Sequence, residues 1–201
     1  MDIIQNAITK LEARIQGSGA EEGIVTLDTD PDRVTCQFEK GACLRARYGG
    51  RSAEFVTMDP LTATTRIGFM FGAPLEKLPQ RAAASAILNV AAGFFCISRV
   101  LKACSPESHR ECRAALLREI GSMRVYPVGM VPHAAEQFPS RAESPGEADI
   151  LLVTGDGMIQ PGFGEMVARF RGEKEIIFLS PSTAGVSALH GCAHWCPFGR
   201  G

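Results

Sequence analysis

The sequence has no excess of charge of either sign and no run of basic residues. Its 201 residues contain 21 lysines and arginines against 22 aspartates and glutamates, which gives a formal net charge of -1. Proteins that bind nucleic acid carry clustered basic side chains that contact phosphates. The composition therefore predicts no nucleic-acid partner and favours a small or neutral ligand.

The first residues do not predict a secretory leader, and long apolar segments are missing from the sequence. An aspartate stands at position 2, and no apolar h-region follows it. The longest apolar stretch, residues 82–97, contains Asn89, is followed by Arg99 and Lys102, and is shorter than the roughly 20 residues that cross a bilayer. We expect a cytoplasmic protein without a membrane partner, in which this stretch forms a buried helix.

Common nucleotide-binding and nucleophile motifs are missing as well. Neither G-x-G-x-x-G nor G-x4-G-K-[ST] occurs, and there is no G-x-S-x-G. Ser180 or Ser182 with His190 would supply a nucleophile and a base, but no spacing pattern fixes their geometry. The sequence therefore identifies no reaction.

The first half of the chain combines helical periodicity with short strand-like runs. Apolar residues at helical spacing predict an amphipathic helix over residues 2–16. Turn residues separate four β-prone runs at 24–29, 33–39, 42–48 and 54–57, which predicts an antiparallel meander. A further helix is expected over residues 74–103.

The second half is typical of a parallel α/β layer. Ser105 is a predicted N-cap for a helix that runs to Ile120. Apolar runs at 124–128, 149–154 and 175–179 are of the kind found in strands buried on both faces, with a helix over 164–171 between the last two. Residues 133–148 are expected to form a long loop. The fold class predicted for the chain is α/β.

Seven cysteines in a chain expected to be cytoplasmic indicate metal binding or packing rather than disulfides, because cellular thiols are kept reduced. Residues 104–112 contain a C-x4-H-x2-C arrangement, and residues 190–196 alternate histidine and cysteine. These groups bind zinc, copper(I) or iron-sulfur clusters. The candidate metal ligands are Cys104, His109, Cys112, His190, Cys192, His194 and Cys196.

The other cysteines have a simpler interpretation. Free cysteine behaves as a small hydrophobe and is often buried. Cys36, Cys43 and Cys96 lie within apolar-patterned segments and are expected to be packing residues. The same interpretation stays open for the candidate ligands.

A second constellation follows the predicted parallel strands. In open α/β sheets, ligands bind beyond the carboxyl ends of the strands, where small residues let backbone N–H groups face an anion. Glycine, serine and aspartate are also ordinary loop and cap residues. The candidates here are Thr154, Gly155, Asp156, Ser180, Ser182 and Thr183.

Several of these segments occur in a familiar order. Asn89 within residues 86–90, then residues 129–132, 148–155 and 177–183, resemble an uncharacterised heavy-metal chelation family in which an enolase N-terminal-like domain precedes a Rossmann-like domain. The resemblance implies an α+β lobe over residues 1–103 and an abbreviated Rossmann-like lobe over 104–201. It also implies a ligand site between the lobes, with Asn89 beside the strand-end residues.

Three hypotheses follow. The first is a metal-binding or metal-handling protein with zinc, iron or an iron-sulfur cluster on the cysteine and histidine clusters. The second is a small-molecule-binding protein or enzyme with its site at the strand ends. The third is a scaffold without catalytic function that forms a homodimer through the apolar helix 82–103.

Overall fold

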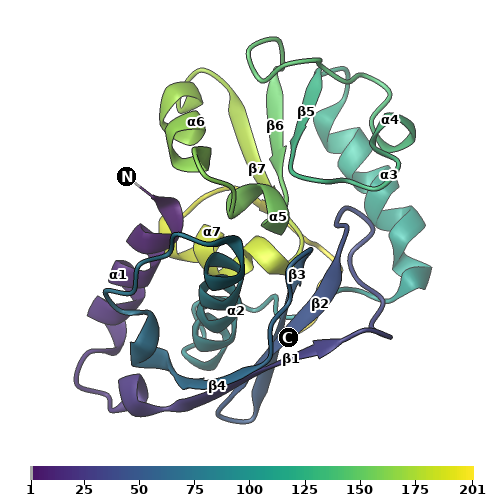
Figure 1. The fold of residues 1–201 in the computed structure, drawn as a ribbon. Helices are drawn as coiled ribbons and strands as arrows, with labels where there is room; N and C mark the ends of the chain where they lie inside the picture. Colours follow the sequence, from purple (N-terminus) through teal and green to yellow (C-terminus); the bar gives the residue numbers. More distant parts are fainter. Residues whose placement is uncertain (1) are drawn as a thin grey trace.

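A computed structural model describes residues 2–201 and shows a mixed α/β fold with two four-stranded sheets (Figure 1). The first sheet is antiparallel, in the order β3-β2-β1-β4, and the second is parallel, in the order β5-β6-β7-β8. The predicted α/β fold class is confirmed. The strands are β1 (Ile24–Asp30), β2 (Ala42–Tyr48), β3 (Arg51–Thr57), β4 (Ala63–Arg66), β5 (Val125–Val128), β6 (Ile150–Val153), β7 (Glu175–Leu179) and β8 (His194–Trp195).

The antiparallel sheet contains three of the four predicted strands of the meander, and a fourth strand that was not predicted, β4, completes it. β1, β2 and β3 pair in sequence order, and β4, which was not predicted, pairs with β1. The predicted strand at 33–39 is wrong, because this segment is irregular and closes a turn between the Glu39 N–H and the Cys36 carbonyl at 3.0 Å. Cys36 and Phe38 instead insert into the core beside the parallel sheet. Tertiary packing has overridden the alternating pattern.

Helix α2 (Leu78–Phe94) lies at the centre of the molecule. It packs on β2 and β3 and also contacts α1 (Ile3–Ile15) and α7 (Ala184–His190) (Figure 1). The prediction of a helix to residue 103 is wrong, since α2 ends at Phe94 and Cys96 then adopts a positive φ of 55°. Because α2 is buried within the chain, it does not offer the dimer surface that was expected, and the homodimer stays a prediction.

The parallel sheet is buried on both faces. Ile150 and Leu152 of β6 point into one core, and Leu151 and Val153 point into the other. Helices α3 (His109–Ile120) and α4 (Ala134–Gln137) lie to one side of this sheet, and α6 (Phe163–Phe170) lies to the other (Figure 1). The short helix α5 (Gly155–Met158) follows β6 directly. Residues 2–201 also contain the 3-10 turns η1 (Ala20–Glu22), η2 (Ile67–Met70), η3 (Pro106–Ser108) and η4 (Pro181–Thr183).

Ser105 does not cap α3 as predicted. The turn η3 precedes the helix, and the Ser105 side chain makes no cap hydrogen bond. The predicted loop at 133–148 contains α4 and the fully buried Phe138, which stacks on Phe38 with ring centroids 6.0 Å apart. This contact fastens the loop to the irregular 33–39 segment.

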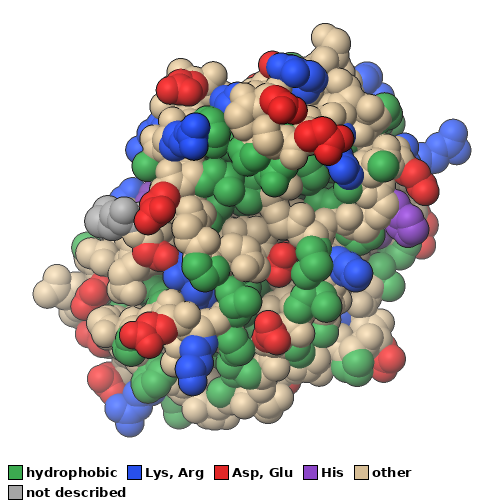
Figure 2. Space-filling model, turned by 45° about the horizontal axis from the view of Figure 1, so that its top comes forward, with side chains coloured by type: hydrophobic (Ala, Val, Ile, Leu, Met, Phe, Trp, Pro, Cys, Tyr) green, Lys and Arg blue, Asp and Glu red, His purple; other side chains and the backbone are tan. Residues whose placement is uncertain are grey.

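The larger hydrophobic core contains side chains from both predicted domains, so the division at residue 103 stays a prediction. Within residues 2–201, no helix is both long and apolar enough to span a membrane. Figure 2 shows one face of the molecule, on which acidic and basic side chains are interspersed.

Candidate functional site

The strand-end residues form a buried network whose polar groups bond to one another. The Thr154 hydroxyl accepts from the Gly157 N–H at 3.3 Å and donates to the Val128 carbonyl at 3.2 Å. The Thr183 hydroxyl donates to the Leu179 carbonyl at 2.7 Å. These two threonines therefore fasten the loops that follow β6 and β7.

Asn89 joins α2 to this network. Its side-chain amide donates to the carbonyls of Pro181 at 3.1 Å and Ser182 at 3.0 Å, and its carbonyl accepts from the Gly185 N–H at 2.8 Å. The Asn89 side chain is fully buried. The structure thus brings Asn89 and the strand-end residues together, as the resemblance implied, but in a packed arrangement.

Glu39, which the sequence did not single out, fills the position where a strand-end ligand was expected. Its carboxylate accepts from the Gly155 N–H at 3.1 Å and from the Ser182 hydroxyl at 2.9 Å. Burial raises the pKa of Glu39 to about 7, although hydrogen bonds from Ser180, Ser182 and Gly155 act to lower it. No sequence pattern indicates this contact, because Glu39 lies in the segment that was misassigned as a strand.

Asp156 lies at the margin of the same network. Its carboxylate accepts from the Met130 N–H at 3.3 Å. Burial raises its pKa, and the nearby charge of Asp59 acts in the same direction. Asp156 therefore fixes the loop after β5 rather than facing an empty cavity.

Four cysteines from distant parts of the sequence lie near enough for their thiols to affect the pKa of other members of the group. Cys104, Cys112 and Cys196 were predicted metal ligands, whereas Cys36 was expected only to pack. The thiols of Cys112 and Cys196 each interact electrostatically with all three others. We refer to Cys36, Cys104, Cys112 and Cys196 as the four-thiol set.

The C-terminal segment places Cys196 beside Cys104. Arg200 forms an isolated antiparallel bridge with Lys102, with backbone hydrogen bonds of 2.9 and 3.0 Å, and its guanidinium donates to the Ala103 carbonyl at 3.0 Å. A turn closes between the Gly199 N–H and the Cys196 carbonyl at 3.1 Å. The end of the chain is thereby held against the residues that precede Cys104.

Gln37 fixes the position of the neighbouring Cys36. The Gln37 side-chain amide donates to the His109 backbone carbonyl at 2.6 Å, and the Gln37 backbone carbonyl accepts from the Gln137 side chain at 3.0 Å. Since Cys112 lies one helical turn after His109, these bonds place Cys36 near the start of α3.

Burial is the main cause of the raised pKa values in the four-thiol set. It raises the pKa of Cys196 to about 12 and that of Cys36 well above the ordinary range, and it also raises those of Cys104 and Cys112. For Cys36 the Glu39 carboxylate acts in the same direction, and neighbouring thiols do so for Cys36, Cys112 and Cys196. In the absence of a cation the four groups are therefore protonated thiols at neutral pH.

The remaining candidate metal ligands divide into two groups. His109 lies at the start of α3 near the four-thiol set, and within residues 2–201 its buried Nε2 has no hydrogen-bond partner. His194 donates from Nε2 to the Ser180 carbonyl at 2.8 Å, and His190 contacts Lys10 and the Ile3 carbonyl. The Cys192 thiol interacts with Lys10 and Arg171. The C-terminal run is thus split between different surroundings and does not form the local cluster that was predicted.

No three or more His, Cys, Asp or Glu side chains in the described part of the chain are arranged to hold a single metal ion. A tetrahedral ion requires its sulfur ligands within about 4 Å of each other, since a Zn–S bond measures about 2.3 Å. A four-iron cluster instead binds each thiolate to a different iron, and it therefore takes a wider set of thiols.

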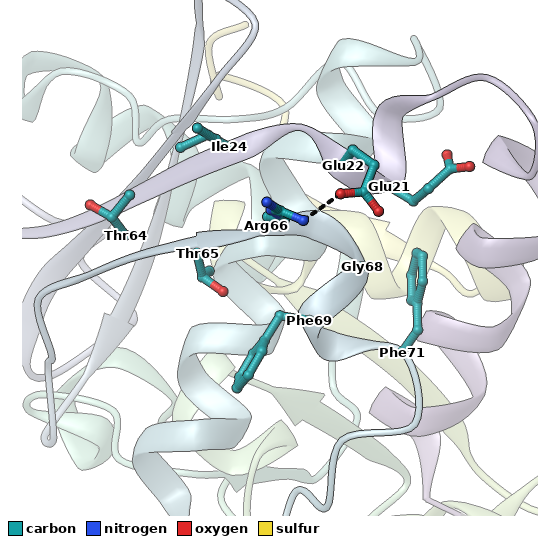
Figure 3. A pocket seen from close by; sticks show the side chains of 9 residues that line it. All are labelled: Glu21, Glu22, Ile24, Thr64, Thr65, Arg66, Gly68, Phe69 and Phe71. Atoms are coloured by element: carbon teal, nitrogen blue, oxygen red, sulfur yellow. Dashed lines mark hydrogen bonds and ion pairs between the residues drawn. The ribbon is translucent and has the colours of Figure 1, made fainter.

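A pocket of about 490 Å³ opens beside the four-thiol set, lined by Cys104 together with charged side chains that include Asp32 and Arg200. Another pocket, of about 640 Å³, is shown in Figure 3 at the edge strand β4. The ion pair between Arg66 and Glu22, 2.5 Å long, crosses it, and both side chains are exposed. None of the predicted site residues lines that second pocket.

Comparison with known proteins gives a fold and no activity. No protein-family model matches the chain, and no curated protein matches it. A solved structure from Desulfitobacterium hafniense DCB-2, described as a DUF364 family protein with unknown function, has a TM-score of 0.53 and 16% identity over 94% of this chain and 85% of its own. A DUF364 protein of unknown function from Pyrococcus horikoshii has a TM-score of 0.49 and 9% identity, covering 88% and 79%. The chain thus shares its fold with a DUF364 protein from D. hafniense whose own function is unknown.

Proposed function

We propose that this protein is a metal-binding protein whose centre is held by the thiolates of Cys36, Cys104, Cys112 and Cys196. The observation that carries the proposal is that thiols from four separate segments lie within electrostatic range, with Cys112 and Cys196 each affected by or affecting the other three. The resemblance of the sequence to a heavy-metal chelation family also supports the proposal of metal binding.

The form of the centre that we propose is an iron-sulfur cluster. The arrangement does not suit a single ion, and thiolate from four cysteines is the usual ligand set of a four-iron cluster. A cation would stabilise the thiolates, so each buried thiol would release its proton to solvent as its sulfur–metal bond forms. His109, with its unpaired Nε2, is an alternate ligand.

The surroundings of the set fit such a centre. Cys36 and Cys112 belong to the core that also contains Leu116 and Phe138, which limits access of water and oxygen. Cys104 lines the charged pocket of about 490 Å³, which provides a route for metal entry. We also propose a cytoplasmic location, where free thiols stay reduced.

The experiment is elemental and sulfide analysis of anaerobically purified protein, with an ultraviolet-visible spectrum and electron paramagnetic resonance after reduction. We expect iron and acid-labile sulfide in comparable amounts. The variants Cys112→Ser and Cys196→Ser should lose most of both, because each of these thiols interacts with the other three.

Two controls make the test specific. Cys43→Ser removes a buried thiol on β2, and Cys192→Ser removes a thiol of the predicted C-terminal run that lies outside the set. Both should retain the metal. Stoichiometric zinc without sulfide would support a metal centre and overturn the cluster, and no bound metal in the unaltered protein would overturn both.

A second candidate function is a small-molecule site or an active site at the strand ends. The observation in its favour is Glu39, a buried carboxyl with a pKa of about 7 that contacts Ser182. The Gly155 N–H and the Ser182 hydroxyl already donate to the Glu39 carboxylate, so a ligand at the strand ends would have to displace Glu39. The test is nuclear magnetic resonance of the protein titrated with small carboxylates and phosphates. Changes confined to the Gly155 and Ser182 amide resonances would support a strand-end site, and unchanged resonances would count against it.

A further inference from the structure

A pocket of about 430 Å³ lies where α1, α6 and the end of α7 meet, apart from the four-thiol set. The pocket is lined by Ile3 and Lys10 on one face of α1 and by Val167 and Ala168 on one face of α6. Arg171, the residue directly after α6, also lines it. Its volume falls within the usual range of roughly 300–1,000 Å³ for small-molecule sites.

The charge of this pocket is positive. Lys10 and Arg171 line it, and no aspartate or glutamate does. The Arg171 guanidinium has no hydrogen bond or ion pair within residues 2–201. An unpaired guanidinium offers a planar fork of donors that matches the oxygens of a phosphate or a carboxylate.

His190 directs the second cation toward the pocket. Its Nε2 lies 3.0 Å from the Ile3 carbonyl, which can only accept, so Nε2 carries the proton. Nδ1 is then a lone-pair acceptor for the Lys10 ammonium at 3.3 Å. Burial lowers the pKa of His190, and the charges of Lys10 and Arg171 act in the same direction, so the ring is neutral and holds Lys10 in place.

We propose that this pocket binds the phosphate of a small organic phosphate monoester, with Arg171 and Lys10 on the phosphate and the apolar part of the ligand on Ile3, Val167 and Ala168. A phosphate monoester carries about -1.5 to -2 charges at pH 7, which matches the two cations. A single carboxylate would leave one cation without a partner. The pocket is independent of the metal centre, because none of its lining residues belongs to the four-thiol set.

The test is isothermal titration calorimetry of the full chain with phenyl phosphate, inorganic phosphate and benzoate at low ionic strength. We expect phenyl phosphate to bind more tightly than the other two probes, because it has both the charge and the apolar part. Arg171→Gln and Lys10→Gln should each weaken its binding by about tenfold, as expected for the loss of a charge-assisted hydrogen bond.

Arg169→Gln is the matched control. Arg169 lies on the same helix over the Phe170 ring and does not line the pocket, so this variant should bind as the unaltered protein does. Circular dichroism of every variant checks that it is folded. Absence of phenyl phosphate binding at millimolar concentration, or equal losses in Arg169→Gln and Arg171→Gln, would overturn the proposal. If inorganic phosphate bound as tightly as phenyl phosphate, the proposal that the ligand has an apolar organic part would be overturned.

Discussion

The strand-end network and the four-thiol set are both buried between segments distant in sequence, yet they differ in how their polar groups are satisfied. In the network, Asn89 and Ser182 each take part in several hydrogen bonds of 2.8 to 3.1 Å. In the four-thiol set, the groups are weak donors and acceptors, and burial, Glu39 and neighbouring thiols all contribute to their raised pKa values. The comparison indicates that hydrogen bonds fix the network in place, whereas the thiols are held mainly by burial, and a metal centre at these thiols is our proposal.

The largest expected effect tests the structural role of the network. Asn89→Ala removes an amide that serves three backbone groups and leaves buried donors and acceptors without partners, so we expect a loss of about 3 kcal/mol or more in the free energy of unfolding. Urea denaturation measures this loss. Gln160→Ala, which removes one half-buried bond to the Asp156 carbonyl, should cost less than about 1 kcal/mol. Similar values for both variants would contradict the structural role of Asn89.

The next effect concerns pH and Glu39. Since the pKa of Glu39 is higher in the folded protein than its ordinary value of 4.5, folding favours the protonated form. The associated stability is present below pH 4.5 and is lost as pH rises toward about 7, by roughly 2–3 kcal/mol. Urea denaturation of metal-free protein from pH 4.5 to 8 measures this slope. In Glu39→Gln the slope should be weaker by that amount, and an unchanged slope would show that Glu39 does not titrate in this range.

A smaller effect tests how tightly the C-terminal turn holds its cysteine. A Cβ at Gly199 would lie 2.7 Å from the Cys196 sulfur and 2.6 Å from the Val100 side chain. We expect Gly199→Ala to cost about 1–2 kcal/mol through overpacking and to lower the metal content by displacing Cys196. Gly146→Ala, whose Cβ would meet only the Ser144 hydroxyl at 3.9 Å, is the control. Full metal content in Gly199→Ala would show that the position of Cys196 is not critical.

The smallest effect concerns a cysteine outside the set. Cys96 is exposed and has a φ of 55°, a conformation that glycine adopts without strain. We expect Cys96→Gly to raise the free energy of unfolding by about 0.5–1 kcal/mol and to leave the metal content unchanged. Thermal and urea denaturation measure the gain, and Cys96→Ala, which keeps the strained backbone, should show none. Loss of metal in Cys96→Gly would extend the site beyond the four thiols.

Cys96 also shows where sequence patterns misled. It was expected to pack inside a helix that continued to residue 103, because the apolar composition persists beyond Phe94. The positive φ turns the chain away there, and no periodicity encodes that change of direction. Cys36 packs in the core as expected, but the segment 33–39 around it is irregular, because a β-prone run is compatible with both a strand and an irregular segment that packs.

The sequence by itself determined the elements whose apolar patterns are strong. The amphipathic helix α1, the strands β1 to β3 and the buried strands β5 to β7 lie where their patterns placed them, because burying an apolar stripe or a β-branched run dominates local structure.

Only the tertiary structure decided which side chains meet. The bridge between Arg200 and Lys102 carries Cys196 to Cys104, and the Gln37 side chain carries Cys36 to α3. Glu39 reaches Gly155 across 116 positions of sequence. Such contacts depend on how whole layers pack, and the free energy that fixes them is distributed over the two cores rather than encoded in any local motif.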